Sequence, residues 1–318
     1  MILAISPESS GRRLDKFLFA YLNNAPHSFI YKMLRKKRIK LNGARAAGSE
    51  ILSAGDEVRF FFSDETLQGC RKARVFEKAA GLDEIVFEDE NLLVVNKSAG
   101  IFSQGGNASN RQLLPQILFY LQKSGAYGGE NADFIPGICN RLDVNTSGLV
   151  VCGKSLHALQ AMNHLFANRG IKKEYVVITH GVVGAVGETR VLEDFYEKDE
   201  RRNIARVLAS GSKSIVTSYT VRAVSKDFSL LSVSPITGRS HQIRVHLAHV
   251  GHPIVGDKKY GGASPLAKSQ LLHCRRLEIA AEVPQFPQFP YTIGTAWDAP
   301  LPPSFTVIIK KIFTEVSL

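Results

Sequence analysis

From about residue 83 onward, apolar stretches of strand length outnumber helical stretches and do not alternate with them in a regular order. A doubly wound fold requires that alternation, because each crossover between parallel strands needs a helix. The pattern instead predicts an α+β fold with a mostly antiparallel central sheet flanked by helices and loops. Two of the expected strands flank an Asp-Glu-Asn turn at residues 89–91 and form a hairpin within residues 83–100; the others cover residues 148–153, 174–181, 213–224, 228–235 and 304–313. The expected helices cover residues 111–125, 155–170 and 240–251.

The first part of the 318-residue chain has a different pattern. Residues 1–63 predict a small α/β domain, whose two helices we expect to be capped by Ser10 and Ser28. Its elements are expected in the order helix 9–22, helix 27–38, strand 39–43 and strand 54–62. No periodic pattern covers residues 64–82, which we interpret as a linker. Residues 83–318 then form the second, larger domain.

Positive charge is concentrated in the first fifty residues. The whole chain has 40 basic and 29 acidic residues, a net charge of +11. The stretch "YKMLRKKRIKLNGAR" contains no acid and seven basic residues, namely Lys32, Arg35, Lys36, Lys37, Arg38, Lys40 and Arg45. A local excess of this kind indicates that the charge serves to bind a polyanionic partner, such as nucleic acid or an anionic membrane, rather than only to keep the protein in solution.

Several classes of protein are disfavoured. No apolar run is long enough to cross a bilayer, and the start "MILAISPESS" has no basic n-region, so we expect a cytoplasmic protein without a membrane partner. No glycine-rich loop of the nucleotide-binding type occurs. The four cysteines are too scattered for a zinc ribbon or a disulfide framework. They are Cys70, Cys139, Cys152 and Cys274.

The stretch "PITGRSHQIRVHLAHVGHPIVGDKKYGG" is rich in histidine. If it is helical, His246 and His249 share a face at a spacing that can bind a metal ion. However, the H-E-x-x-H pattern is absent, and apolar residues at helical spacing indicate an ordinary amphipathic helix that ends at Gly251. We therefore predict no metal site.

A lone carboxylate, Asp143, lies in the polar stretch "NRLDVNTSGLVV" before an apolar strand. Such stretches are usually turns. An aspartate that must react while buried needs a cation nearby, since burial raises a carboxyl pKa and a guanidinium lowers it by ~1–3 units. Arg244 is a candidate partner. Arg141 is two residues from Asp143, so the side chains of Arg141 and Asp143 would project the same way on an extended strand.

These residues carry a resemblance. "RLDVNTSGLVV" and "TGRSHQIRVHLAHVGHPIVGDKKYGG" resemble the two signature blocks of the RluA family of pseudouridine synthases, and "NLLVVNKSAG", "KKEYVVITHG" and "WDAPLPPSF" are similar to further segments of that family. Residues 1–63 resemble the ribosomal-protein-S-four-like RNA-binding domain, and "HSFIYKMLRKKRIKLNG" is most similar to the RluC subfamily. The sequence departs from the family at Asn140, where His is usual, and at Ser98, where Pro is usual.

The resemblance implies an enzyme that converts uridine to pseudouridine in RNA, without a cofactor or a metal. By this resemblance Asp143 is the essential carboxylate, Arg244 pairs with it, and Tyr175 stacks on the base. Arg141 fills the space that the flipped nucleotide leaves, since a guanidinium plane can stack there. Arg239 is expected to contact the RNA as well. Ile243 and Leu272 are candidates for the apolar floor of the pocket that holds the base. Packing in the hydrophobic core explains these two residues equally well or better.

The expected substrate is rRNA, most specifically that of the large subunit, and the expected state is a monomer. Two alternatives remain open from the sequence. A non-catalytic RNA-binding or ribosome-assembly factor on the same fold explains the charge, but not Asp143, Tyr175 and Arg244 together. A metal-dependent RNA hydrolase that uses the histidines lacks carboxylate partners.

Overall fold

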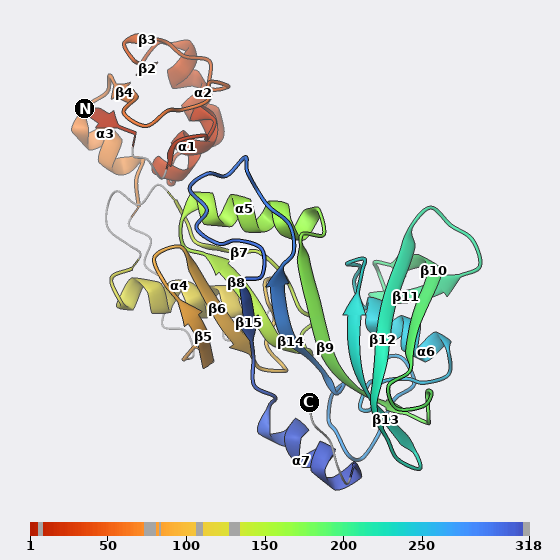
Figure 1. Cartoon of the computed structure of the whole chain (residues 1–318). Coiled ribbons are helices and arrows are strands. Elements are labelled where there is room, and N and C mark those ends of the chain that lie inside the picture. Colours follow the sequence, from red (N-terminus) through yellow and green to blue (C-terminus); the bar gives the residue numbers. More distant parts are fainter. Residues whose placement is uncertain (6–8, 73–80, 83, 106–110, 127–133, 314–318) are drawn as a thin grey trace.

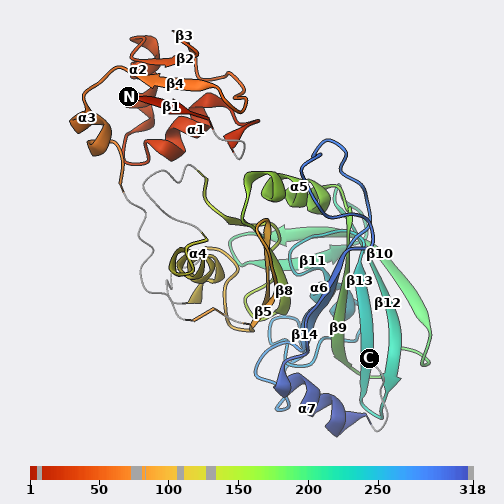
Figure 2. The ribbon, with the colours of Figure 1, turned by 60° about the vertical axis from the view of Figure 1, so that its left-hand side comes forward.

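The computed structural model describes residues 1–5, 9–72, 81–82, 84–105, 111–126 and 134–313. Figure 1 shows a small N-terminal unit and a larger unit built around one long sheet, and the small unit stands apart from the large one in both views (Figures 1 and 2). The elements of the small unit are β1 (Ile2–Ala4), α1 (Leu14–Tyr21), α2 (His27–Arg35), β2 (Ile39–Leu41), β3 (Ala44–Arg45), β4 (Glu57–Phe60) and α3 (Asp64–Gly69).

The small unit has a hydrophobic core of its own, formed by one face of each helix against the sheet. Leu14, Phe17 and Leu18 of α1 are buried, as are Ile30 and Leu34 of α2. The four strands form an antiparallel sheet in the order β1-β4-β2-β3. Both predicted helices and both predicted strands of this region are therefore present.

The predicted caps of these helices are wrong. The N-cap of α1 is Arg13 rather than Ser10, and the N-cap of α2 is Pro26 rather than Ser28; neither side chain makes a cap hydrogen bond. Strand β1 was also missed, because three residues carry no pattern of their own and owe their conformation to pairing with β4. The helix α3 covers the first residues of the predicted linker, and its Leu67 belongs to the N-terminal core.

The large unit contains one sheet of 11 strands among the described residues. Its order is β11-β10-β12-β13-β9-β14-β8-β6-β5, with β7 paired to β8 and β15 paired to β14. Its strands are β5 (Glu84–Glu88), β6 (Leu92–Lys97), β7 (Gly137–Ile138), β8 (Ser147–Gly153), β9 (Ile171–His180), β10 (Thr189–Asp199), β11 (Ile204–Leu208), β12 (Ser214–Val224), β13 (Phe228–Pro235), β14 (Leu272–Ile279) and β15 (Ala296–Asp298). Its helices are α4 (Leu113–Lys123), α5 (Leu156–Ala167), α6 (Gln242–His249) and α7 (Pro303–Ile312).

The predicted fold class is confirmed, because all the pairs of this sheet are antiparallel except β8 with β14. The prediction of a strand over residues 304–313 is wrong, since this segment forms α7. Its run of β-branched residues suggested a strand, but Phe305, Ile309 and Phe313 repeat every four residues and are all buried on one side of the helix. Strands β10, β11 and β14 were not predicted; β10 is mostly exposed and carries little apolar signal.

Two of the apolar clusters of the large unit lie on either side of its centre. One packs β6 and β8 against α4 and α5, and the other packs β9, β12 and β13 against α6. In the sheet, β8 and β6 lie on one side of β14, and β9, β13 and β12 lie on the other, as Figure 1 shows. Tyr175 of β9 packs against both clusters, so it marks the place where the two halves meet.

The parallel pair β8–β14 depends on a glycine. Gly148 has φ +114°, and a β-carbon there would lie 2.2 Å from the backbone oxygen of Cys274. We expect Gly148→Ala to lower the free energy of unfolding by about 3 kcal/mol, since it adds backbone strain to a clash with main-chain atoms. Gly69→Ala, in α3 with open space around it, should stay within about 1 kcal/mol of the wild type. Urea unfolding of both variants measures this, and equal stabilities would contradict the role of Gly148.

Candidate active site

A cavity of about 740 Å³ opens where the two halves of the sheet meet. Its lining comes from the turn before β8, from β9, and from the loops on either side of α6. Two carboxylates line it, Asp143 and Asp257. The basic residues that line it are Arg141, Lys173, Lys198, Arg239, Arg244, Lys258, Lys259 and Lys268. Cations therefore outnumber carboxylates around the cavity, which suits a polyanionic ligand.

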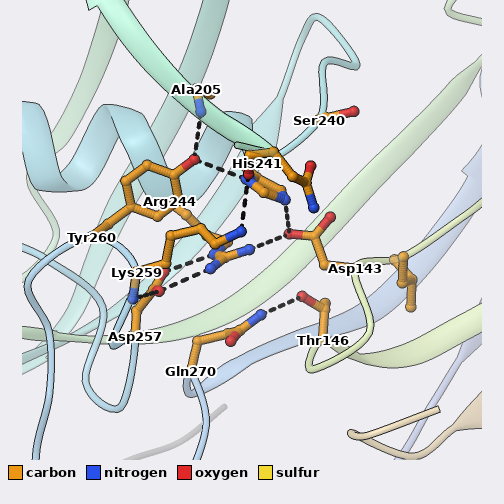
Figure 3. A network of polar contacts seen from close by, with 12 residues as sticks. Asp143, Thr146, Ala205, Ser240, His241, Arg244, Asp257, Lys259, Tyr260 and Gln270 are labelled. Carbon is orange, nitrogen blue, oxygen red and sulfur yellow. Dashed lines mark hydrogen bonds and ion pairs between the residues drawn. The ribbon is translucent and has the colours of Figure 1, made fainter. Parts of the chain in front are cut away.

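Asp143 stands at the first position of a tight turn, as the polar stretch predicted. The backbone N–H of Thr146 donates to the carbonyl oxygen of Asp143 at 3.0 Å. The Asp143 side chain is 24% exposed and faces Arg244, whose Nη1 donates to Oδ2 at 2.8 Å. The structure thus brings together two predicted site residues that are 101 positions apart in the chain (Figure 3).

Arg244 also binds a second carboxylate that the sequence reasoning missed. Its Nε and Nη2 donate to the two oxygens of Asp257 at 2.7 and 2.9 Å. Asp257 is almost fully buried, and it follows α6 in the quoted stretch "GDKKYGG". Burial alone lowers the pKa of Arg244, but its contacts with Asp257 and then Asp143 raise the pKa above its usual value. The guanidinium therefore remains charged at any physiological pH.

The two oxygens of Asp143 have different surroundings. Oδ2 accepts the hydrogen bond from Arg244, and Nε2 of His241 lies 3.9 Å from the same oxygen. Oδ1 accepts no hydrogen bond from the residues that the structure describes. In Figure 3 this oxygen points away from Arg244. The arrangement leaves one carboxylate oxygen available to a bound ligand.

Tyr175 lines the cavity from β9, half-buried. Burial, and then the neighbouring Cys274, raise the pKa of the Tyr175 hydroxyl well above its usual value. The phenol is therefore neutral at physiological pH, so it offers a ring face and a hydrogen-bond donor rather than a phenolate. Lys173, two residues earlier on the same strand, also lines the cavity and was not predicted as a site residue; burial lowers its pKa.

The two remaining predicted arginines lie at the exposed edge of the cavity. Arg141 and Arg239 are both exposed and both belong to the lining. No strand is assigned over the segment from Arg141 to Asp143, but both side chains belong to the lining of the same cavity. Ile243 and Leu272 line the cavity and also belong to an apolar cluster, which agrees with both alternatives for them.

The predicted basic residues of the N-terminal unit lie on its surface. Lys40 is half-buried, with its ammonium group 5.3 Å from the centre of the Phe61 ring. The other six are exposed, namely Lys32, Arg35, Lys36, Lys37, Arg38 and Arg45. They lie between the last turn of α2 and strand β3. This part of the chain therefore forms one continuous segment with exposed cationic side chains.

A buried lysine holds the Asp143 turn in place. The ammonium group of Lys97, at the end of β6, donates to the carbonyl oxygens of Ser98, Ile101 and Val144 at 2.9, 2.9 and 3.3 Å. It thereby joins the loop after β6 to the residue that follows Asp143. Because the lysine is fully buried, these carbonyls compensate for its loss of hydration.

The residues at which this sequence departs from the RluA pattern have defined places. Asn140 donates to the carbonyl of Leu149 at 3.0 Å and accepts from the N–H of Val151 at 2.9 Å. Its amide therefore ties the segment before Asp143 to β8. Ser98 is exposed, and its carbonyl is one of the acceptors of Lys97.

The histidines of the α6 region have roles other than a shared metal. His246 is fully buried, with Nδ1 2.8 Å from Thr217 Oγ1 and Nε2 3.3 Å from Asp194 Oδ2, whereas His249 is exposed. Within the described ranges no cluster of three or more His, Cys, Asp or Glu side chains is arranged to hold a metal ion. None of the helices in the same ranges has the length and apolar content of a membrane span.

Comparison with known proteins identifies the family of this site. Residues 91–249 match the family model described as RNA pseudouridylate synthase. The chain is a member of the RNA pseudouridylate synthase family. Residues 12–58 match the S4 domain model. The resemblance inferred from the motifs is thereby confirmed, and the protein is an enzyme that isomerises uridine in RNA.

Curated relatives and solved structures agree with this membership. Ribosomal large subunit pseudouridine synthase C of Escherichia coli K12 is 32% identical over 82% of this chain and 79% of its own length. The protein of the same name from Haemophilus ducreyi is 30% identical over 98% of this chain and 95% of its own. Human RNA Pseudouridylate Synthase Domain Containing 4 has the same fold, with a TM-score of 0.52 and 24% identity over 71% of this chain and 92% of its own.

The double carboxylate contact of Arg244 predicts a large effect of Asp257→Asn. The variant removes a buried counter-charge from a buried guanidinium, so we expect the free energy of unfolding to fall by about 3–5 kcal/mol. Asp298→Asn breaks an exposed ion pair with Arg276 and should cost less than about 1 kcal/mol. Urea unfolding of the two variants makes the comparison. A similar small loss for both would contradict the structural importance of Asp257.

Proposed function

We propose that this RNA pseudouridylate synthase acts on large-subunit rRNA, with Asp143 as the essential carboxylate. The observation that carries the assignment of Asp143 is its pairing with the buried Arg244 at a cavity whose basic lining residues outnumber its carboxylates. The substrate assignment is supported by the names of the relatives that are 30–32% identical to the chain.

The reaction moves one glycosidic bond. The C1′–N1 bond of uridine breaks, the uracil turns, and a C1′–C5 bond forms; C5 loses its proton and N1 gains one. The product is an isomer of the substrate, so atoms and electrons balance without another reactant. In one route Asp143 attacks C1′, and in the other it removes a proton from C2′ to give a glycal. Oδ1 is the oxygen available for either role.

The other cavity residues have assignable tasks. The uridine must leave the base stack, at a cost of a few kcal/mol. Arg141, exposed at the edge, can insert into the space left behind and stack on the neighbouring bases. The ring of neutral Tyr175 offers a face for the flipped uracil. Arg239 and the lysines of the cavity edge can bind the phosphates on either side.

A test of the activity uses RNA tritiated at uracil C5. We expect the wild type to release tritium from large-subunit rRNA in the presence of EDTA, and Asp143→Ala and Asp143→Asn to release none above background. Cleavage of the RNA that EDTA abolishes, without release of tritium, would support the metal-dependent hydrolase. Absence of release by the wild type, together with tight RNA binding, would support the non-catalytic binding factor.

The exposed basic segment of the N-terminal unit should act as a phosphate-binding handle. We expect the double variant Lys36→Glu, Arg38→Glu to bind rRNA more weakly and to reduce the slope of log K against log salt by about 0.9 for each phosphate that is no longer neutralised. Filter binding between low and high salt measures this slope. Lys310→Glu, Lys311→Glu on α7 makes the same charge change outside the cavity lining. An equal effect of both pairs would indicate only the net charge of the protein.

A further inference from the structure

The backbone of His241 has an unusual conformation. It precedes α6 as its N-cap, with φ 58° and ψ 12° in the left-handed region. Residues with a β-carbon rarely adopt this conformation, although histidine does so more readily than most, and it recurs at turns and at functional sites. The conformation places the imidazole between Tyr260 and Asp143 (Figure 3).

The hydrogen bonds of Tyr260 determine which imidazole nitrogen carries the proton. The backbone N–H of Ala205 donates to the Tyr260 oxygen at 2.8 Å, and the same oxygen lies 2.8 Å from Nδ1 of His241. The hydroxyl has one proton to donate, and Nδ1 is its one acceptor among the residues described. Nδ1 of the neutral ring therefore accepts, and the ring proton is on Nε2.

The neutral ring is the favoured form. Burial lowers the pKa of His241 below its usual value. Asp143 opposes this by favouring the charged ring, while Arg244, Lys259 and Lys198 disfavour it. Nε2–H therefore faces Asp143 as a neutral donor rather than as a cation.

Two donors converge on one oxygen of Asp143. Arg244 Nη1 lies 2.8 Å and His241 Nε2 lies 3.9 Å from Oδ2. The second distance is about 1 Å longer than a hydrogen bond. Catalytic hydrogen bonds are often long in the free enzyme and shorten in the substrate complex.

We propose that His241 is a positioning residue: held by Tyr260 as the Nε2–H tautomer, it donates to Oδ2 of Asp143 in the substrate complex and so directs Oδ1 at the ribose. The proposal rests on the proposed role of Asp143. It assigns a joint purpose to three features, which are the left-handed backbone at residue 241, the Tyr260 hydroxyl and the unequal surroundings of the two Asp143 oxygens.

Two substitutions at residue 241 test the hydrogen-bond donor of the side chain separately from the left-handed conformation of the backbone. His241→Gln keeps an N–H donor at nearly the reach of Nε2, while His241→Asn suits the left-handed backbone but is too short to reach Asp143. We expect the single-turnover rate of His241→Asn to fall about 10–100-fold, the worth of a hydrogen bond to a charged group, with RNA affinity unchanged. His241→Gln should recover most of the rate.

The outcomes at residue 241 are distinguishable. Equal rates for the wild type and both variants would overturn the proposal, as would a loss of RNA affinity that accounts for the whole defect. An inactive wild type would instead overturn the proposed function.

The pH profile of Tyr260→Phe gives a readout that a purely structural role does not affect. Without the hydroxyl, the neutral ring loses its hydrogen bond at Nδ1, so the pKa of His241 rises. A protonated His241 would hold the Asp143 carboxylate in an ion pair, so activity should be lost at a higher pH than in the wild type. We expect the acid limb of the single-turnover rate to move up by about 0.5–1 pH unit.

A matched control is a tyrosine of β10, Tyr196, which contacts the residue before His241. The hydroxyl of Tyr196 donates to the carbonyl of Ser240 at 2.9 Å, next to His241 but not on its ring. Tyr196→Phe should leave the acid limb where it is in the wild type. An unmoved acid limb in Tyr260→Phe, or an equal shift in both variants, would overturn the proposal.

Discussion

The buried guanidinium of Arg244 is the interaction on which the rest of the site depends. It binds Asp257 with two hydrogen bonds and Asp143 with a third, and its side chain is only 7% exposed. A buried charge is tolerated when partners surround it, and removal of one partner leaves an uncompensated charge. The loop after α6, the helix itself and the turn before β8 must therefore take their places together. A lysine could not serve here, because it lacks the planar fork that reaches two carboxylates.

Much of this arrangement could be predicted from the sequence where the signal is local. The polar turn at Asp143, the hairpin β5–β6 and the capped helix α5 each follow from residues within a few positions of one another. The pairing of Asp143 with Arg244 was also predicted, although 101 residues separate them. A chemical requirement made Arg244 a candidate, since a carboxylate that works while half-buried needs a cation, and the resemblance to the RluA family implied the pairing itself.

The features that were missed depend on tertiary contacts. Asp257 was not singled out, because nothing nearby in the sequence shows that it will be buried against Arg244. Strand β10 is mostly exposed and owes its conformation to pairing with β12. The segment that forms α7 has a composition typical of a strand, and only its burial at every fourth residue reveals the helix. In each case the environment, rather than the local propensity, determined the outcome.

The parallel contact between β8 and β14 has a consequence for the order of assembly. Ser147 and Gly148 pair with His273 and Cys274, and Ser147 Oγ lies 2.9 Å from a ring nitrogen of His273, 126 residues further along the chain. Contacts between such distant segments form late, because a long loop must close first. During synthesis, the strand that carries the turn of Asp143 thus waits for β14 to leave the ribosome. The basic N-terminal unit, with a core of its own, is complete much earlier, so a nascent chain can hold RNA before it can modify it.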